Sequence, residues 1–413
     1  MRYFFLIIIL LITAFITWIN INLYSENYSP SEKKADIILQ LNFLESRLKN
    51  DNLGLQMQEM FPEGYVFINA LYGLAWCELG LSDFQKDPAL KEKVVHEALY
   101  AYNEINSEKA NWTFDQNLIP RYGIFYCGWK NYLLSKLLSV DTAFQGHELY
   151  MYEFKSQCDS IVHALTNAKS PYLQSYNAQS WPADMFVAIA SLSNHDKIFK
   201  SKYKEEIDTW IQNVMNKLDP VTHLIPHQVD SETGETVQGA RGCSLSLILR
   251  MLGEIKPKLA NEQFKLFETN FVSTTFGLPS IREYPKGQHG HGDIDSGPVI
   301  FGVGFSGTIV MIGTYYMLNS GYLAEKQYKT INAFGFGKRT GNQKKYLFGK
   351  LPMADAFIAW GRATGLNYQN PSKSTDNWRI KFHVISLLVI LLFWIIYFRK
   401  IIISIIKTAT NGT

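Results

Sequence analysis

The chain is poor in cysteine and nearly neutral, and both features exclude functions. Its 413 residues include 4 cysteines, Cys77, Cys127, Cys158 and Cys243, without the Cys-x-x-Cys spacing of zinc ribbons and redox motifs. Its 40 basic and 37 acidic residues leave a net charge of +3, and no basic cluster interleaves with aromatic residues. Nucleic acid is therefore not an expected partner. We expect the cysteines to be small buried hydrophobes, with one or two disulfides as the alternative.

Two other patterns are missing. No internal repeat of fixed period runs along the chain, which favours a closed ring of helices over an open helical array. The glycines at 287, 290, 292 and 297 follow no strand of a βαβ unit. They therefore do not form a phosphate-binding fingerprint.

Long apolar runs are present at both ends of the chain. They span Phe4–Asn22 and Phe382–Phe398, and each approaches the roughly 20 residues that a membrane-spanning helix needs. A signal peptide is the alternative for the first run, but no small-residue cleavage site follows it. A buried core helix is the alternative for the second. We predict an N-terminal transmembrane anchor over 1–24, a transmembrane helix over 380–400 and a short tail over 401–413.

Basic residues predict the orientation. Those on the terminal sides of the two apolar runs are Arg2, Arg399, Lys400 and Lys407. By the positive-inside rule they place both termini in the cytoplasm and the middle of the chain outside the cell membrane. Three basic residues just before the second apolar run argue weakly for the opposite orientation: Lys373, Arg379 and Lys381.

The stretch 31–370 predicts one all-α domain. Apolar segments alternate with charged, amphipathic ones, for example 65–79 with 88–105 and 181–192 with 201–217. A helix that is apolar all round is buried, whereas one with a polar face lies at the surface. The alternation therefore predicts an inner ring of helices within an outer ring, an (α/α)6 toroid of about six hairpins; an irregular helical array is the rival.

One segment interrupts the helical pattern. Residues Thr222–Asp230 and Glu235–Gly239 alternate in polarity on either side of a turn that contains Gly234. This pattern predicts a short β-hairpin. We expect the hairpin at the mouth of the ring, because loops at such positions carry function.

Five short segments within roughly residues 65–336 resemble the linalool dehydratase/isomerase-like family of α/α barrels. They are Ala70–Ala75, Tyr126–Trp129, Pro182–Ala188, the hairpin at 224–239 and Ile281–Glu283. The resemblance implies an (α/α)6 toroid with a central pocket, and dehydration and isomerisation of a monoterpene alcohol. It also implies a histidine where this chain has Trp129, a cysteine where it has Asp184, and an acid–tyrosine pair with no clear counterpart in this chain. Because this chain lacks these residues, the resemblance implies the central pocket of the family but not its reaction mechanism.

A glycine-rich loop carries two acids, Asp293 and Asp295. If the segment between them is extended, both carboxylates face the same way. Two close carboxylates raise the pKa of one partner, which suits a general acid beside a base. As alternatives, Asp295 or Ser296 caps a helix that starts at Pro298, or the acids bind calcium, although their spacing matches no EF-hand loop.

Other polar residues have two interpretations each. His289 and His291 could move protons, bind a metal or simply be solvated, and His227 is either solvent-exposed or part of the site. Asp184 either interacts with the dipole of its helix or supplies a second carboxylate. Arg282 and Glu283 form either a buried ion pair or an anion clamp.

These residues lead to one functional prediction: a membrane-anchored hydrolase, lyase or isomerase that acts on a glycan or an isoprenoid-like lipid, with no metal and no cofactor. The predicted catalytic residues are Asp184, Asp293, Asp295 and His291. The predicted substrate-binding residues are Trp129, Trp181, His227, Arg241, Arg282, Glu283 and His289. Asp184 and Asp293 would act as acid and base. One alternative, implied by the resemblance, is a linalool dehydratase/isomerase-like hydro-lyase that acts on a terpenoid alcohol. The other is a non-catalytic, membrane-anchored binding or assembly protein, in which these acids would not converge.

Overall fold

The computed structural model describes residues 2–24, 28–83, 87–368 and 377–410. Parts of the predicted domain, 84–86 and 369–370, lie outside the described residues, as do Lys373 and the last three residues of the predicted tail.

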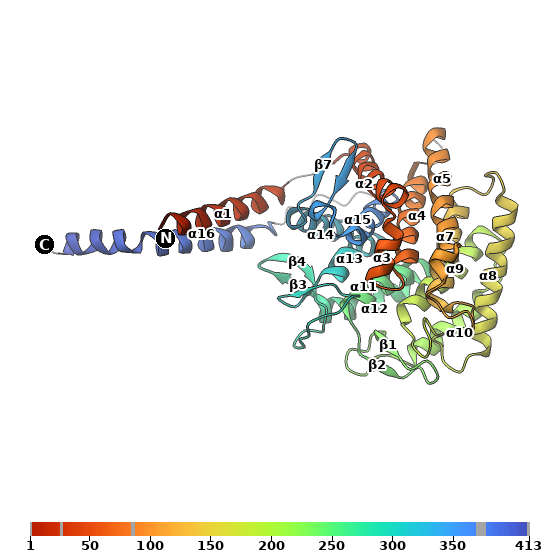
Figure 1. Cartoon of the computed structure of the whole chain (residues 1–413). Coiled ribbons are helices and arrows are strands. Elements are labelled where there is room, and N and C mark those ends of the chain that lie inside the picture. Colours follow the sequence, from red (N-terminus) through yellow and green to blue (C-terminus); the bar gives the residue numbers. More distant parts are fainter. Residues whose placement is uncertain (1, 25–27, 84–86, 369–376, 411–413) are drawn as a thin grey trace.

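Six helices of the described chain form a closed inner ring (Figure 1). They are α4 (Gly64–Asp83), α7 (Gly123–Val140), α9 (Pro182–Ile198), α11 (Gly242–Ile255), α13 (Phe305–Met317) and α15 (Pro352–Thr364). Each packs against the next, and α15 packs against α4, which closes the ring. These helices are buried nearly all round, as their apolar sequences require.

An outer helix packs against each member of the inner ring. The outer helices are α5 (Pro88–Ile105), α8 (His147–Asn167), α10 (Lys204–Met215), α12 (Pro257–Phe271), α14 (Gly321–Phe334) and, against α15, α2 (Pro30–Asn50). Local signals set their limits: Asp87 accepts a hydrogen bond from the backbone of Leu90, and Pro88 occupies the first turn of α5. The predicted (α/α)6 toroid is confirmed.

Four antiparallel hairpins interrupt the helices of the described chain. They are β1 (Gln228–Val229) with β2 (Thr236–Gln238), β3 (Val272–Thr275) with β4 (Leu278–Ile281), β5 (Val299–Ile300) with β6 (Val303–Gly304), and β7 (Lys338–Thr340) with β8 (Gln343–Lys345). The first is the predicted hairpin, with Val229 paired to Thr236. Short helical segments complete the order: α3 (Leu53–Met60), α6 (Glu108–Asn111) and the 3-10 turn Leu347–Gly349.

One local prediction is wrong. No helix starts at Pro298, because the chain there enters β5–β6 and α13 begins at Phe305. Neither Asp295 nor Ser296 therefore caps a helix, and their side chains are left for another role.

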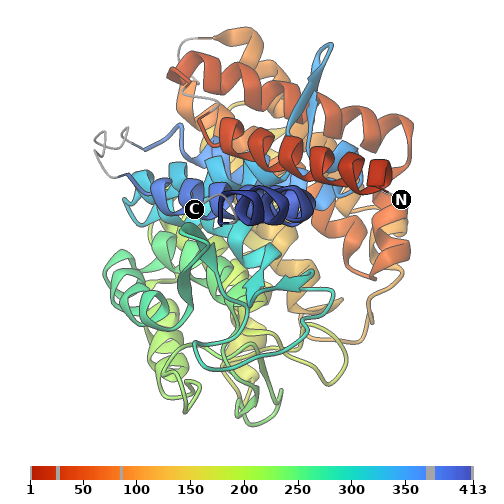
Figure 2. The same ribbon diagram turned by 90° about the vertical axis from the view of Figure 1, so that its left-hand side faces the viewer.

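Two apolar helices leave the ring side by side (Figures 1 and 2). They are α1 (Arg2–Asn22) and α16 (Ile380–Thr410), so the stretch 401–410 continues the second helix. Only 11% of each candidate span, Tyr3–Asn22 and Ile380–Arg399, is buried, which argues against a core helix. By length and composition both can cross a membrane.

Candidate active site

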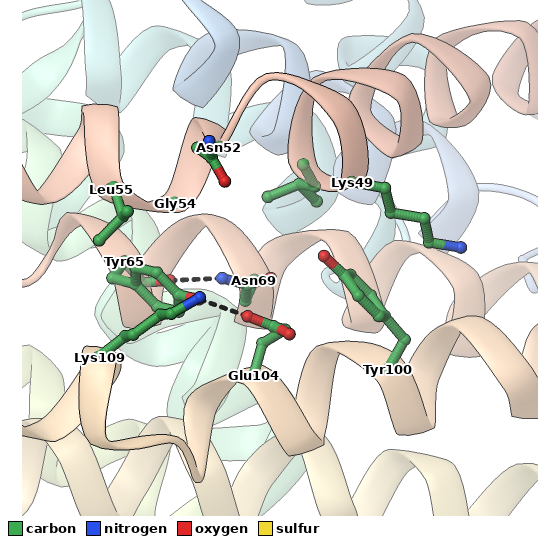
Figure 3. A pocket seen from close by; sticks show the side chains of 10 residues that line it. Lys49, Asn52, Gly54, Leu55, Tyr65, Asn69, Tyr100, Glu104 and Lys109 are labelled. Carbon is green, nitrogen blue, oxygen red and sulfur yellow. Dashed lines mark hydrogen bonds between the residues drawn. The ribbon is translucent and has the colours of Figure 1, made fainter.

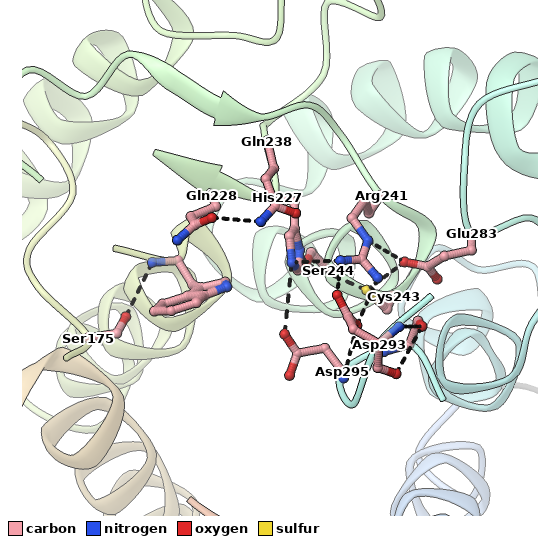
Figure 4. Close-up of polar contacts among 12 residues, drawn as sticks. Ser175, His227, Gln228, Gln238, Arg241, Cys243, Ser244, Glu283, Asp293 and Asp295 are labelled. Atoms are coloured by element: carbon pink, nitrogen blue, oxygen red, sulfur yellow. Dashed lines mark hydrogen bonds and ion pairs between the residues drawn. The ribbon is translucent and has the colours of Figure 1, made fainter. Parts of the chain in front are cut away.

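The first turns of several inner helices, together with the loops before them, meet at one mouth of the ring. Asp184 lies in the first turn of α9, Arg241 immediately precedes α11, and Glu283 belongs to the segment that leads to α13. Figure 4 shows side chains from these distant segments converging: His227, Arg241, Glu283, Asp293 and Asp295. The ring therefore brings together most of the polar residues that the sequence singled out.

Arg241 organises this cluster. Its guanidinium donates from Nε to Glu283 at 2.7 Å and binds both carboxylate oxygens of Asp293, the Nη2 contact being 2.9 Å. Burial would raise the pKa of Asp293, but Arg241 lowers it to about 2. Asp293 is therefore a permanently ionised partner of Arg241, which suits a positioning role better than the predicted role in proton transfer.

The predicted pair of Arg282 with Glu283 is not formed. Glu283 is completely buried and bonds to Arg241, whereas Arg282 donates to the backbone oxygens of Tyr284 at 3.2 Å and Gln288 at 3.0 Å. Arg282 thus braces the loop that carries the acids. Burial raises the pKa of Glu283 against the opposing effect of Arg241.

His227 has a defined tautomer. Because arginine can only donate, the Nη1 of Arg241, 3.2 Å away, makes the Nε2 of His227 an acceptor. The ring proton then lies on Nδ1 and is donated to the hydroxyl of Ser244. Burial and Arg241 lower the pKa of His227 to about 3, so the ring is neutral. A histidine that donates to Ser244 cannot take its proton, so these residues do not form a Ser-His-Asp relay.

His227, Asp293 and Asp295 also offer ligand atoms within 4.8 Å of one another, a spacing that could hold a metal ion. Arg241, however, already neutralises Asp293 and occupies the lone pair of His227. A metal ion bound here would have to displace the guanidinium of Arg241 or lie next to its positive charge. The donor set therefore favours the ion pair over a metal.

Asp184 is the most perturbed acid of the site. Its side chain is buried and accepts a hydrogen bond from Ser175 at 2.6 Å. Burial raises its pKa to about 8, the charges of Glu63 and Asp295 act in the same direction, and the Ser175 bond only partly opposes them. Asp184 is thus a proton-bearing carboxyl group at neutral pH.

Asp295 is the second perturbed acid. Its Oδ2 lies 3.8 Å from the Nε2 of His227, and 52% of its side chain is exposed. Partial burial, followed by the charges of Asp293 and Glu63, raises its pKa to about 6. The charge of Asp295 in turn helps to raise the pKa of Asp184.

The loop around the acids is a tight turn, so the condition of an extended segment between Asp293 and Asp295 is not met. The backbone nitrogens of Asp295 and Ser296 both donate to the Oδ1 of Asp293 at 3.1 Å, and the backbone of Asp293 donates to Ser296 at 2.9 Å. Asp293 therefore shapes the turn that presents Asp295. His289 and His291, predicted to bind substrate and to move protons, are both exposed on the same loop.

The two predicted tryptophans differ in exposure. Trp181 is half-buried and lies edge-on to Tyr176, with ring centroids 5.2 Å apart. Trp129 is completely buried inside the ring, 4.8 Å from the ring of Phe67 and 6.2 Å from that of Trp360. Trp181 can present a face to a ligand, whereas Trp129 packs the core.

Some residues of the site were not predicted. Glu63 immediately precedes α4, and Ser175 lies in the loop before α9. Ser244 and Cys243 follow Arg241, and the Cys243 thiol lies 3.0 Å from Glu283. Burial raises the pKa of Cys243 well above its ordinary value, so it is not a thiolate. The sequence offered one signal for these residues, which is their position: each lies just before an inner helix or in its first turn.

A separate cavity of about 230 Å³ lies between α2, α3, α4 and α5 (Figure 3). Tyr65 donates there to Glu104, and Asn69 bonds the backbone oxygen of Tyr65 at 2.9 Å. Burial and Glu104 raise the pKa of Tyr65. Its lining residues include none of the acids at the mouth.

No family model and no curated protein matches the chain. Among solved structures, the chain is similar to an unsaturated glucuronyl hydrolase specific for heparin, with 10% identity and a TM-score of 0.51 over 85% of this chain and 97% of that chain. A C. acetobutylicum ATCC 824 glycoside hydrolase from family 105 has 15% identity and a TM-score of 0.47 over 72% and 93% of the chains. A D-mannose isomerase has 10% identity and a TM-score of 0.46 over 72% of this chain and 86% of that chain. The similarity to the glucuronyl hydrolase shows a shared fold.

Proposed function

We propose that the protein is an enzyme that acts on a glycan by carboxylate acid–base chemistry, with Asp184 as general acid and Asp295 as general base. The observation that carries this proposal is the separation of the two pKa values, about 8 for Asp184 and about 6 for Asp295. Between these values one carboxyl group holds a proton while the other is free to accept one. This division of roles is what hydrolysis, elimination or isomerisation needs at neutral pH.

The other site residues have supporting roles in this scheme. Asp293 and Arg241 hold the turn that presents Asp295, and Ser175 holds the carboxyl group of Asp184. Trp181, half-buried beside Tyr176, offers an aromatic face for a sugar ring. The exposed His289 and His291 would contact the outer part of a longer substrate.

The fold supports a glycan as the substrate class. The glucuronyl hydrolase that shares this fold is specific for heparin, which is itself a glycan. This is an analogy of fold, and the carboxyl groups themselves support only the type of chemistry.

The test uses the full chain in detergent and a panel of oligosaccharides, with release or rearrangement of sugars as the readout. Asp184→Asn and Asp295→Asn should each lower turnover by about 100-fold or more, since each removes one proton-transfer group. Asp159→Asn, on the exposed surface of α8, is the matched control and should keep full activity. Turnover that survives both site substitutions would favour a binding protein instead.

A second candidate is suggested by the apolar surroundings of the site. The ring centroids of Phe67 and Phe357, both half-buried, lie 5.3 Å apart, and those of Phe125 and Tyr176 lie 6.0 Å apart. Aromatic walls of this kind also suit a terpenoid alcohol, the substrate implied by the linalool dehydratase/isomerase-like resemblance. Including such an alcohol in the same panel distinguishes the two substrates, and Asp184 would be the proton donor for either.

A further inference from the structure

Four phenylalanines occupy turns whose backbone is left-handed. They are Phe276 (φ 54°), Phe301 (φ 53°), Phe336 (φ 50°) and Phe348 (φ 59°). A bulky side chain is unfavourable in this conformation, which glycine or asparagine usually adopts. Three of the rings are also exposed, with exposed fractions of 46% for Phe276, 73% for Phe301 and 67% for Phe348. Neither backbone preference nor packing in the ring explains phenylalanine at these turns.

The turn of β3–β4 lies beside the base of α16 (Figure 1). A Cβ added to Gly277, next to Phe276, would lie 2.7 Å from the Cβ of Lys381. Leu278 shares a small apolar cluster with Leu23 and Phe382 at the same place. Phe301 then contacts Phe276 edge-on, with ring centroids 5.3 Å apart.

The other two phenylalanines lie beside α1. Phe336 stacks on Trp18 of α1, with ring centroids 4.7 Å apart, and on Phe348 at 5.8 Å. An aromatic chain therefore runs from the apolar helix to an exposed ring. We call Phe276, Phe301, Phe336 and Phe348 the phenylalanine collar.

The same region carries the residues that favour the boundary between lipid and water. Tyr24 and Trp378 flank Arg379, whose guanidinium lies 4.6 Å and 4.3 Å from the two ring centroids. Lys381 is exposed in the first turn of α16. Amphipathic aromatic residues and cations gather at the level of lipid headgroups.

We propose that the phenylalanine collar inserts into the surface of the bilayer that α1 and α16 cross, and so brings the acid loop to a glycan that is itself attached to a lipid. The collar is continuous with the two apolar helices, which selects lipid as its occupant. The backbone nitrogen of Glu283 bonds to the oxygen of Gly302, next to Phe301, at 3.1 Å, so the collar borders the candidate site directly. The substrate part of this inference rests on the proposed function; the insertion of the collar does not.

Insertion is tested without any substrate. The full chain, with Phe301→Cys or Phe348→Cys carrying an environment-sensitive fluorophore, is placed in phosphatidylcholine–phosphatidylglycerol vesicles that contain spin-labelled lipid. Tyr152→Cys on α8, 74% exposed on the far side of the ring, is the matched control. The unaltered chain, in which three cysteines are buried and Cys127 half-buried, gives the labelling background.

Emission at positions 301 and 348 should shift to the blue and lose intensity when quenching lipid is present, while position 152 stays water-like. Water-like, unquenched emission at 301 and 348 would overturn the insertion of the collar. Unchanged thermal unfolding of each labelled chain shows that the ring is intact.

The substrate class is tested with Phe276→Ser combined with Phe301→Ser. In the same vesicles this double variant should lose turnover of a lipid-linked oligosaccharide and keep that of the same oligosaccharide free in solution. Equal loss on both would overturn the lipid-attached substrate. If the unaltered chain processes neither the lipid-linked nor the free oligosaccharide, the proposed function fails. The emission experiment still tests whether the collar inserts into the bilayer.

Discussion

Asp184 carries a cost to stability that follows from its burial. Its pKa is about 8 in the folded protein against an ordinary value of 3.8, so between these values the unfolded chain releases a proton that the folded chain keeps. The folded state therefore loses stability as the pH rises through this window, and the loss levels off above it. Groups of this kind are tolerated where function needs them.

Asp184→Asn should therefore stabilise the protein. Asparagine has no charge to bury, and its side-chain oxygen can still accept the hydrogen bond from Ser175. The gain should be on the order of a few kcal/mol near neutral pH and should shrink towards acid pH. Thermal unfolding at several pH values measures it, with Glu59→Gln on the exposed face of α3 as the control. A gain independent of pH would contradict burial of the Asp184 carboxyl group as its cause.

The pH dependence of activity should report both acids. With Asp295 ionised and Asp184 protonated in the active form, kcat/KM should rise through about 6 and fall through about 8. Glu63 raises both pKa values through its charge. Glu63→Gln should therefore move both limbs of the profile to lower pH.

The control for this shift is Glu59→Gln on α3, an exposed acid four residues earlier in the chain. It should leave the profile in place. A Glu63→Gln variant that loses activity at every pH without moving either limb would assign Glu63 a structural role instead.

At the scale of the helices, the inner ring depends on glycines where two backbones approach closely. A Cβ on Gly307 of α13 would lie 2.9 Å from the backbone carbon and oxygen of Gly242, which opens α11. A Cβ on Gly253, in the same α11, would have as its nearest neighbour the side-chain Cβ of Met317 at 3.4 Å, an ordinary contact, and the nearest backbone atom at 3.9 Å. The two positions form a natural pair for comparison.

Gly307→Ala should destabilise the ring by about 1 to 3 kcal/mol, because backbone cannot move aside as a side chain can. Gly253→Ala should be neutral or stabilising by up to about 1 kcal/mol, because alanine favours the helix. Thermal or denaturant unfolding compares them. Equal effects at the two positions would mean that α11 and α13 do not meet as closely as described.

The inner and outer helices could be predicted because burial leaves a periodic signal. A segment such as 181–192 is apolar all round, whereas 201–217 has one polar face, and each occupies the predicted layer as α9 and α10. The hairpins β3–β4, β5–β6 and β7–β8 were not predicted. Strands of two to four residues are too short to show a period, and the apolar turns at Phe276 and Phe301 look like parts of helices.

The candidate site was predictable in its residue types but not in its pairing. Asp184, His227, Arg241 and Asp293 were named from local sequence, and the ring brings them to one mouth. Asp293 is bound by Arg241 through an ion pair between residues 52 positions apart, which local sequence does not reveal. This ion pair is the reason why Asp295, and not Asp293, is proposed as the partner of Asp184. Glu63 is further still along the chain, and only closure of the ring brings it near Asp295.

At the scale of the whole molecule, α1 and α16 form an antiparallel pair with both chain ends at the end remote from the ring (Figures 1 and 2). Polar side chains join the two helices: Asn20 donates to Ser386 at 3.0 Å, and Trp394 donates to Thr13 at 3.2 Å. Hydrogen bonds of this kind favour association of helices in lipid. If both helices cross a membrane, the two termini must lie on one side and the toroid on the other.

The basic residues Arg2 and Lys407 near these ends predict the cytoplasmic side for both termini. A membrane-impermeant thiol reagent applied to intact cells should therefore label Tyr152→Cys on the ring. It should label cysteines added before Met1 or after Thr413 only once the membrane is permeabilised. The reverse pattern would place the toroid in the cytoplasm, where a lipid-linked glycan would have to be presented from the inner leaflet. Termini on opposite sides would contradict the pairing of α1 with α16, because each crosses the bilayer in the direction opposite to the other.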